Sequence, residues 1–163
     1  MKKFRQKPFT APAWICDALQ TLRPAERLPV SEWAEKYRVL PSGNAIPGPW
    51  RNSVTPYLVE IMDAFSDDMV EEIVFVKPTQ VGGTSAMENA LGSLIAQDPA
   101  PTMIVYPSDD LAKRTVESKL EPMIKSCAPL AKKYRENESE KLALKFADMT
   151  VWLTGANSPA DLA

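Results

Sequence analysis

Lysine, two glycines and three hydroxyl residues lie close together in the segment Lys77-Pro-Thr-Gln-Val-Gly-Gly-Thr-Ser85. A strand-forming run, residues 73–76, precedes this segment, and a helical apolar pattern follows it over residues 83–97. A strand, a glycine loop and a helix in this order are typical of a phosphate-binding loop. The first amides of a helix are unpaired donors beside a partial positive charge, and they attract anions. The segment therefore predicts an anion site at the start of a helix.

The loop departs from the usual pattern G-x-x-x-x-G-K-[ST], which places lysine just before the hydroxyl residue. Here Lys77 stands at the first glycine position, Gly83 stands at the lysine position, and Thr84 supplies the hydroxyl. A displaced lysine can still reach a phosphate, because its ammonium is a point charge on a long flexible stem. The hydroxyl of Thr84 is of the type that holds Mg²⁺ in such loops. An ordinary turn with two glycines is the alternative interpretation.

Composition describes one domain of ordinary size. The chain has 163 residues, of which 45% are hydrophobic and 25% charged, with a net charge of −2. This charge argues against a surface that binds nucleic acid over its whole extent. No window approaches the roughly 18 apolar residues of a membrane span, so we expect a cytoplasmic protein without membrane attachment. The absence of histidine excludes a His-based zinc site or catalytic dyad, and the two cysteines lack metal-ligand spacing.

The remaining pattern predicts a proline-rich, helical N-terminal third followed by alternating strands and helices. We expect short helices over 13–21, over 31–38 with Ser31 as N-cap, and over 55–65. Further strands are predicted over 102–106, 145–146 and 150–153, the last two as a hairpin, with a helix over 109–127 capped by Ser108. Strands that alternate with helices of this length favour an α/β fold with a parallel sheet. Trp50, Arg51 and Tyr57 are candidates for stacking on an adenine ring, with core packing as the alternative.

Several segments, taken together, resemble the ATPase region of the large terminase subunit of tailed bacteriophages, of the lambda-like GpA type. The resemblance covers nearly everything after about Pro29, and it depends on the order and spacing of motifs that are weak individually. These are residues 31–38, Pro47-Gly-Pro-Trp-Arg51, Thr55-Pro-Tyr57, the loop with its displaced lysine, residues 102–108, Leu120-Glu-Pro-Met123 and Gly155-Ala-Asn-Ser-Pro159.

The resemblance implies an incomplete three-layer, P-loop NTPase-like domain over residues 41–163, preceded by an arm over residues 1–40 where a small terminase subunit would dock. It also implies an ATP-driven, homo-oligomeric motor that threads double-stranded DNA through a portal into a capsid in the bacterial host cytoplasm. ATP and Mg²⁺ would be its cofactors, with Thr84 on the metal. Adenine would contact Trp50, Arg51 and Tyr57, and the phosphates would contact Lys77, Gln80, Gly82, Gly83, Thr84 and Ser85.

Two departures from the family pattern bear on catalysis. Gln80 stands where lambda-like loops can carry an arginine, so a transition-state arginine must come from elsewhere, such as a neighbouring subunit. The chain also ends at Ala163, before the apolar strand ending in Asp-Glu that holds Mg²⁺ and activates water in the family. We therefore expect a truncated product or fragment, without the nuclease domain, that binds nucleotide weakly at best and barely hydrolyses it.

Two other interpretations remain open. Another P-loop motor, such as a helicase-like ATPase, would share the phosphate loop. The displaced lysine and the Gly155-Ala-Asn-Ser-Pro159 loop argue against it. A non-enzymatic prophage remnant that binds protein through its N-terminal arm would need no nucleotide at all.

Overall fold

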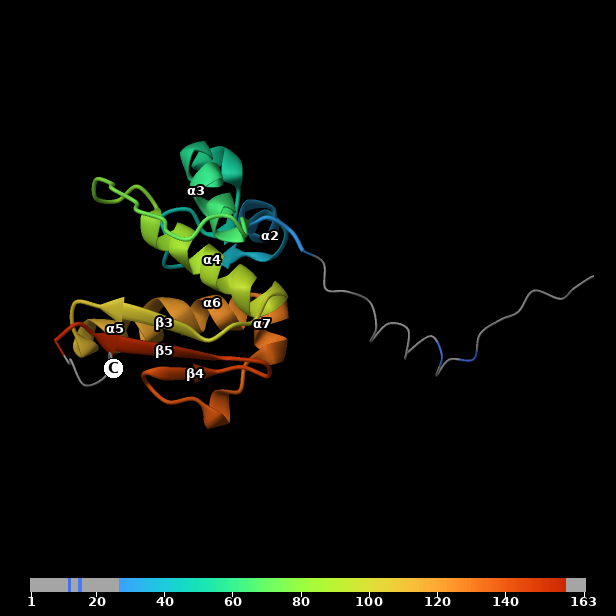
Figure 1. The fold of residues 1–163 in the computed structure, drawn as a ribbon, viewed down its shortest axis with the longest axis vertical. Helices are drawn as coiled ribbons and strands as arrows, with labels where there is room; N and C mark the ends of the chain where they lie inside the picture. Colours follow the sequence, from blue (N-terminus) through green and yellow to red (C-terminus); the bar gives the residue numbers. More distant parts are fainter. Residues whose placement is uncertain (1–11, 13–14, 16–26, 158–163) are drawn as a thin grey trace, which may run out of the picture.

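The computed structural model describes residues 12, 15 and 27–157, and Figure 1 shows the arrangement of the elements. No helix in this part of the chain has the length and apolarity needed to cross a membrane. The helices are α2 (Val30–Tyr37), α3 (Val59–Asp63), α4 (Gly83–Gln97), α5 (Asp109–Thr115), α6 (Glu121–Ser126) and α7 (Ala128–Lys133). The strands are β1 (Val39–Leu40), β2 (Gly48–Pro49), β3 (Thr102–Tyr106), β4 (Ala143–Lys145) and β5 (Thr150–Gly155).

The main sheet has three strands in the order β3-β5-β4. Strands β3 and β5 are parallel, with Thr102 opposite Val151 and Tyr106 opposite Gly155. Strands β4 and β5 form an antiparallel hairpin in which Lys145 pairs with Thr150. The predicted α/β class and the predicted hairpin are therefore confirmed. The sheet is mixed rather than purely parallel, because a hairpin can only join antiparallel strands.

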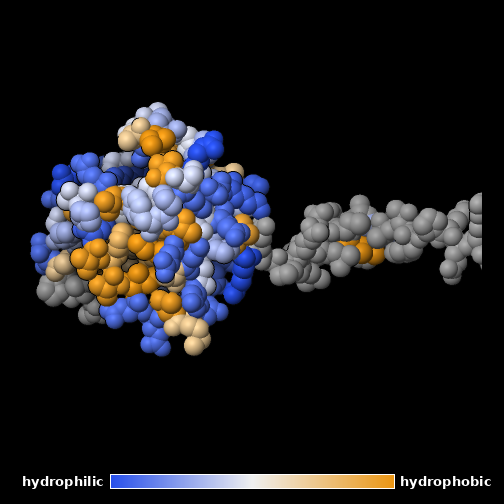
Figure 2. All heavy atoms as spheres, turned by 90° about the horizontal axis from the view of Figure 1, so that it is seen from above, coloured by the Kyte–Doolittle hydropathy of each residue, from blue (hydrophilic) through white to orange (hydrophobic). Residues whose placement is uncertain are grey.

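Helices cover one face of this sheet in the described part of the chain. Helices α5 and α6 lie behind the strands in Figure 1, and α5 contacts both β3 and β5. Val151 and Leu153 are buried, whereas Met103, Val105 and Trp152 on the alternate positions are about half exposed. This alternation follows from the two-residue period of a strand. Figure 2 shows hydrophobic side chains gathered in a patch on one side of the folded body.

Helix α4 packs against α2, α3 and α7, and its packing on α2 is unusually close. A Cβ on Gly92 would lie 2.5 Å from Cη2 of the fully buried Trp33. Glycine at this position lets the indole ring rest on the helix backbone. At the other end of the helix, the ammonium of Lys133 donates to the carbonyls of Ile95 and Ala96 at 3.0 and 3.2 Å. The last turn of α4 therefore has hydrogen-bond partners.

A buried polar network joins the N-terminal third of the chain to the middle of α4. The guanidinium of Arg38 donates to Glu88 Oε2 at 2.7 Å and to Asn89 Oδ1 at 3.1 Å. Burial lowers the pKa of Arg38 and raises the pKa of the Glu88 carboxyl, while the attraction within the pair opposes both shifts. Each charge thus depends on the other, because an unpaired ion in this position would be strongly disfavoured.

The helices predicted in the first third are partly confirmed. Helix α2 corresponds to the predicted helix over 31–38, and a 3₁₀ turn, α3 and a second 3₁₀ turn correspond to the one over 55–65. Ser31 is not the N-cap, since Pro29 holds that position. The Ser31 hydroxyl instead donates to Asp63 Oδ2 at 2.9 Å, so a tertiary partner replaces the local one. The helix predicted over 13–21 falls almost entirely outside the described residues.

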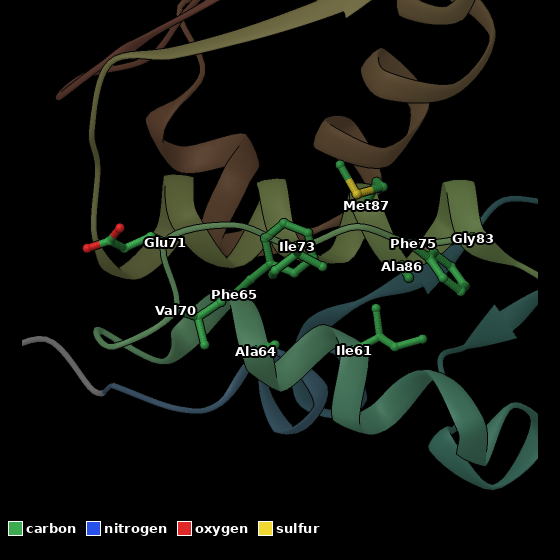
Figure 3. A pocket seen from close by; sticks show the side chains of 10 residues that line it. All are labelled: Ile61, Ala64, Phe65, Val70, Glu71, Ile73, Phe75, Gly83, Ala86 and Met87. Carbon is green, nitrogen blue, oxygen red and sulfur yellow. The ribbon is translucent and has the colours of Figure 1, made fainter. Parts of the chain in front are cut away.

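The strand predicted over 73–76 is wrong. In the structure these residues have no strand assignment, and their backbone makes no hydrogen bond to a described residue. Figure 3 shows Ile73 and Phe75 extending along α4 next to Ala86 and Met87. Val74 and Val76 remain 76% and 91% exposed. The alternating pattern correctly indicated an extended segment with one packed face, but a strand also needs a partner for its backbone.

The second half of the fold agrees with the sequence pattern. Helix α4 and strand β3 have the predicted bounds, and the Ser108 hydroxyl caps α5 by accepting from the Leu111 amide at 3.3 Å. The predicted helix over 109–127 is built from α5, a π-helical turn (Val116–Leu120) and α6. Pro122 lies at the start of α6, directly after the π turn. Proline has no amide to donate, and π turns are one way in which helices accommodate such interruptions.

We expect Arg38→Met to lower the free energy of unfolding by about 3–5 kcal/mol, because it leaves the Glu88 carboxylate buried without its partner. The double variant Arg38→Met/Glu88→Leu should recover most of this loss, since it removes both charges. Urea unfolding followed by circular dichroism measures the change. Arg27→Ala is the control, because Arg27 and Asp98 form a pair whose side chains are 71% and 68% exposed. Equal effects of Arg38→Met and Arg27→Ala would contradict the role assigned to the buried pair.

Candidate functional site

The segment before α4 forms a tight turn that leaves the first amides of the helix without partners. Gln80 and Gly82 have positive φ angles, 60° and 77°, and Gly82 is the N-cap of α4. The Ala86 amide bonds to the Gly82 carbonyl at 3.0 Å, whereas the amides of Gly83, Thr84 and Ser85 have no acceptor among the described residues. Three unpaired donors at the positive end of a 15-residue helix favour a negatively charged ligand.

The displaced Lys77 lies across the start of α4. A Cβ on Gly83 would overlap Cδ and Cε of Lys77, and it would lie 3.1 Å from Cε1 of Phe75. Gly83 is buried, although Lys77 itself is exposed. The Lys77 ammonium makes no hydrogen bond or ion pair with a described residue. The Lys77 side chain therefore reaches the turn from the solvent-exposed segment that precedes it, and the absence of a side chain on Gly83 leaves space for its stem.

A cavity of about 290 Å³ lies beside this contact and is the one drawn in Figure 3. It is bounded by the 70–75 segment, by α3 and by the first turn of α4, and most of its lining is apolar. Glu71 is the one charged side chain among its lining residues. The packing of Ile73 and Phe75 over α4 directs the chain so that Lys77 arrives at Gly83. The side chains that line this cavity support the loop, but few of them could bind a polar ligand.

A second cavity, of about 410 Å³, lies on another side of the turn and gathers the predicted adenine contacts with part of the loop. Trp50 is only 7% exposed and its Nε1 donates to Asn52 Oδ1 at 2.8 Å, so core packing accounts for most of its ring. Arg51 and Tyr57 are exposed at the cavity. The predicted site residues around it are Trp50, Arg51, Tyr57, Gln80, Gly82 and Ser85.

Thr84 lies apart from this group. Its side chain lines a third cavity, of about 470 Å³, between α4 and strand β3. Successive residues of a helix point about 100° apart, which separates Thr84 from Ser85. Within the described residues, no group of three or more Cys, Asp or Glu side chains is placed to hold a metal ion. Thr84 fits Mg²⁺ as a single protein ligand, because this ion commonly takes its other ligands from waters and substrate phosphates.

Sequence reasoning did not predict that residues 55–58 contact and support the turn before α4. The Tyr57 hydroxyl donates to the Val81 carbonyl at 3.1 Å. A Cβ on Gly82 would lie 3.2 Å from Leu58 Cδ1 and 3.9 Å from Thr55 Cγ2. The Thr55 hydroxyl is buried and has no hydrogen-bond partner among the described residues. The Thr55-Pro-Tyr57 motif marked this segment as part of the resemblance, but nothing in its pattern predicted contact with the loop.

The described groups around the turn are suited to binding an anion. Amides, the Lys77 ammonium and the exposed Arg51 are all donors or cations. No Asp or Glu side chain lines the cavity of about 410 Å³ next to the turn. A general base must come within hydrogen-bond reach of the group it deprotonates. Binding is therefore the chemistry that the described residues of this cavity support.

Comparison with known proteins gives two findings. The model of the family "Phage terminase large subunit gpA, ATPase domain" matches residues 44–163, most of the chain. The chain is also 25% identical over 140 residues to the terminase large subunit of Enterobacteria phage P21. That match covers 81% of this chain and 22% of the relative, so the chain spans about a fifth of the relative's length. Because the family model matches most of the chain, the chain belongs to the ATPase-domain family of phage terminase large subunits of the gpA type.

Proposed function

We propose that this chain binds ATP, together with Mg²⁺, at the start of α4, as the nucleotide-binding part of a phage DNA-packaging motor. The observation that carries the proposal is the group of three unpaired amides at Gly83, Thr84 and Ser85, with the Lys77 stem lying on Gly83. Backbone donors and a lysine are the groups that bind polyphosphates in related loops. Membership of an ATPase-domain family makes ATP the expected polyphosphate.

In this proposal the phosphates bind the amides of α4, and the Lys77 ammonium neutralises part of their charge. Lys77, Gln80, Gly82, Gly83, Thr84 and Ser85 form the phosphate site. The base occupies the cavity of about 410 Å³, against Arg51, Tyr57 and the edge of Trp50. The Thr84 hydroxyl would hold Mg²⁺, and the ion would supply positive charge that neutralises part of the phosphate charge.

We propose binding rather than rapid turnover for this chain on its own. Hydrolysis needs a positioned base for water and cationic groups around the transferred phosphate. The cavity beside the turn is lined by no carboxylate, and Gln80 in the turn carries no charge. A carboxylate from elsewhere in a complete motor and an arginine from a neighbouring subunit would supply what these residues lack.

The proposed context is the large terminase subunit at work on viral DNA. The P21 relative is named a terminase large subunit. We propose that this chain acts in the same kind of assembly, a homo-oligomer in the cytoplasm of the bacterial host. Its partners would be double-stranded DNA, the portal and a small terminase subunit that docks on residues 1–40.

Lys77→Ala should weaken the binding of ATP with Mg²⁺ by roughly tenfold to a hundredfold, because it removes a charge-assisted contact to phosphate. Isothermal titration calorimetry on the purified chain measures the dissociation constant. Lys141→Ala is the matched control, since Lys141 is 75% exposed and lies near Glu117 rather than the loop. Equal affinities of wild type and Lys77→Ala, or no binding by wild type, would refute the proposed function.

Gly83→Ala should also weaken ATP binding by about tenfold, because the added methyl group displaces the Lys77 stem from the loop. Its effect on stability should be small, since the far end of a lysine side chain can move. In the Lys77→Ala background the same substitution should change affinity little, and this non-additivity is the informative result. Fully additive effects, measured by the same titration, would show that the glycine and the lysine act independently.

A further inference from the structure

The turn before α4 contains a conformation that its sequence does not favour. Gln80 has a φ of 60°, a region that non-glycine residues rarely adopt, and Gly82 has a φ of 77°. Val81 lies between these two residues, and the peptide group that joins Val81 to Gly82 is followed directly by the left-handed backbone of Gly82. Such a turn persists only when its surroundings hold it in place.

Besides the contacts of Leu58 and Thr55 with Gly82, one side-chain hydrogen bond holds the turn within the described residues. The Tyr57 hydroxyl donates to the Val81 carbonyl at 3.1 Å, across 24 positions of sequence. Tyr57 belongs to a 3₁₀ turn, Pro56–Leu58, whose base is fixed because Leu58 is fully buried. Among the described residues, the backbone of residues 80–82 makes one other hydrogen bond, in which the Gly82 carbonyl accepts from the Ala86 amide. Tyr57 is therefore the tether between the turn and the rest of the body.

The tether acts on the orientation of a single peptide group. A trans peptide is planar, so its carbonyl and its amide point in opposite directions. When the Tyr57 hydroxyl holds the Val81 carbonyl, it also directs the Gly82 amide away from Tyr57. A flip of this peptide would exchange the donor for an acceptor. A carbonyl oxygen in that position would repel a phosphate.

We propose that Tyr57 is a positioning residue of the phosphate site, acting through its hydroxyl on the Val81–Gly82 peptide. This inference rests on the proposed function. It assigns the hydroxyl to the phosphate loop, whereas contact with adenine would use the ring. The substitution Tyr57→Phe separates the two roles, because phenylalanine retains the ring that would contact adenine and lacks the hydroxyl that bonds to Val81.

The test compares wild type and Tyr57→Phe with two separate probes, inorganic pyrophosphate with Mg²⁺ and adenosine. Loss of one hydrogen bond that orients the loop should weaken pyrophosphate binding by about fivefold to tenfold and leave adenosine binding unchanged. Tyr134→Phe serves as the control for a generic effect of the substitution, because Tyr134 lines a different cavity. Unchanged pyrophosphate binding, or an equal loss with both probes, would overturn the inference.

A second measurement separates this inference from the proposed function. The Ala86 amide, which donates to the Gly82 carbonyl of the turn, should exchange faster with solvent in ligand-free Tyr57→Phe than in wild type, with the exchange of β5 unchanged. If wild type binds neither probe, the proposed function fails, and exchange alone then decides about the tether. Faster exchange of Ala86 without a change in β5 supports the positioning role, and unchanged exchange of Ala86 overturns it. Because Tyr57 is 55% exposed, we expect the variant to fold normally.

Discussion

Helix α4 is anchored along its middle and at its last turn, while three amides of its first turn have no acceptor among the described residues. The guanidinium of Arg38 reaches Glu88 and Asn89, and the ring of Trp33 rests on Gly92. The Lys133 ammonium donates hydrogen bonds to two carbonyls in the last turn of the helix. A buried ion pair gives little net stability but strongly disfavours any arrangement that separates it. The N-terminal third and α4 therefore have to pack together, and this fixes where the open amides at Gly83 and beyond are placed.

The displaced lysine and the double glycine are two parts of one feature. In the usual loop, lysine projects from the position that Gly83 holds here. In this chain the lysine arrives from the preceding extended segment, and its stem lies where a side chain on residue 83 would be. Ile73 and Phe75 pack along α4 and guide that segment, although it forms no strand. The same cation can thus reach the loop by a different route.

Local signals in the sequence were sufficient for much of the fold. The apolar period of α4, the short run of β3, the hairpin and the Ser108 cap were all predictable, because each depends on neighbouring residues. The strand prediction for residues 73–76 failed, because a strand needs a neighbouring strand for its backbone hydrogen bonds and a local pattern does not reveal one. Ser31 failed as a cap because Asp63, 32 positions away, takes its hydroxyl. The buried state of Arg38 also depends on a distant element.

The candidate site shows the same division. Two glycines before a helix predicted an anion site at the helix start. The adenine contacts expected of Trp50, Arg51 and Tyr57 stay a prediction, and all three residues line one cavity with part of the turn. The support from the Tyr57 hydroxyl and the stem of Lys77 over Gly83 depend on tertiary contacts that no spacing encodes. The separation of Thr84 from Ser85 was accessible in principle, because adjacent helical residues face different directions.

The central claim is that the amides at the start of α4 bind a polyphosphate. Two-dimensional ¹H–¹⁵N spectra of the labelled chain, recorded during titration with ATP and Mg²⁺, test it most directly. We expect saturable shifts that are largest for the amides of Gly82, Gly83, Thr84 and Ser85, since these protons would gain charged acceptors. Saturable shifts centred on other residues, with these four amides unmoved, would contradict the account.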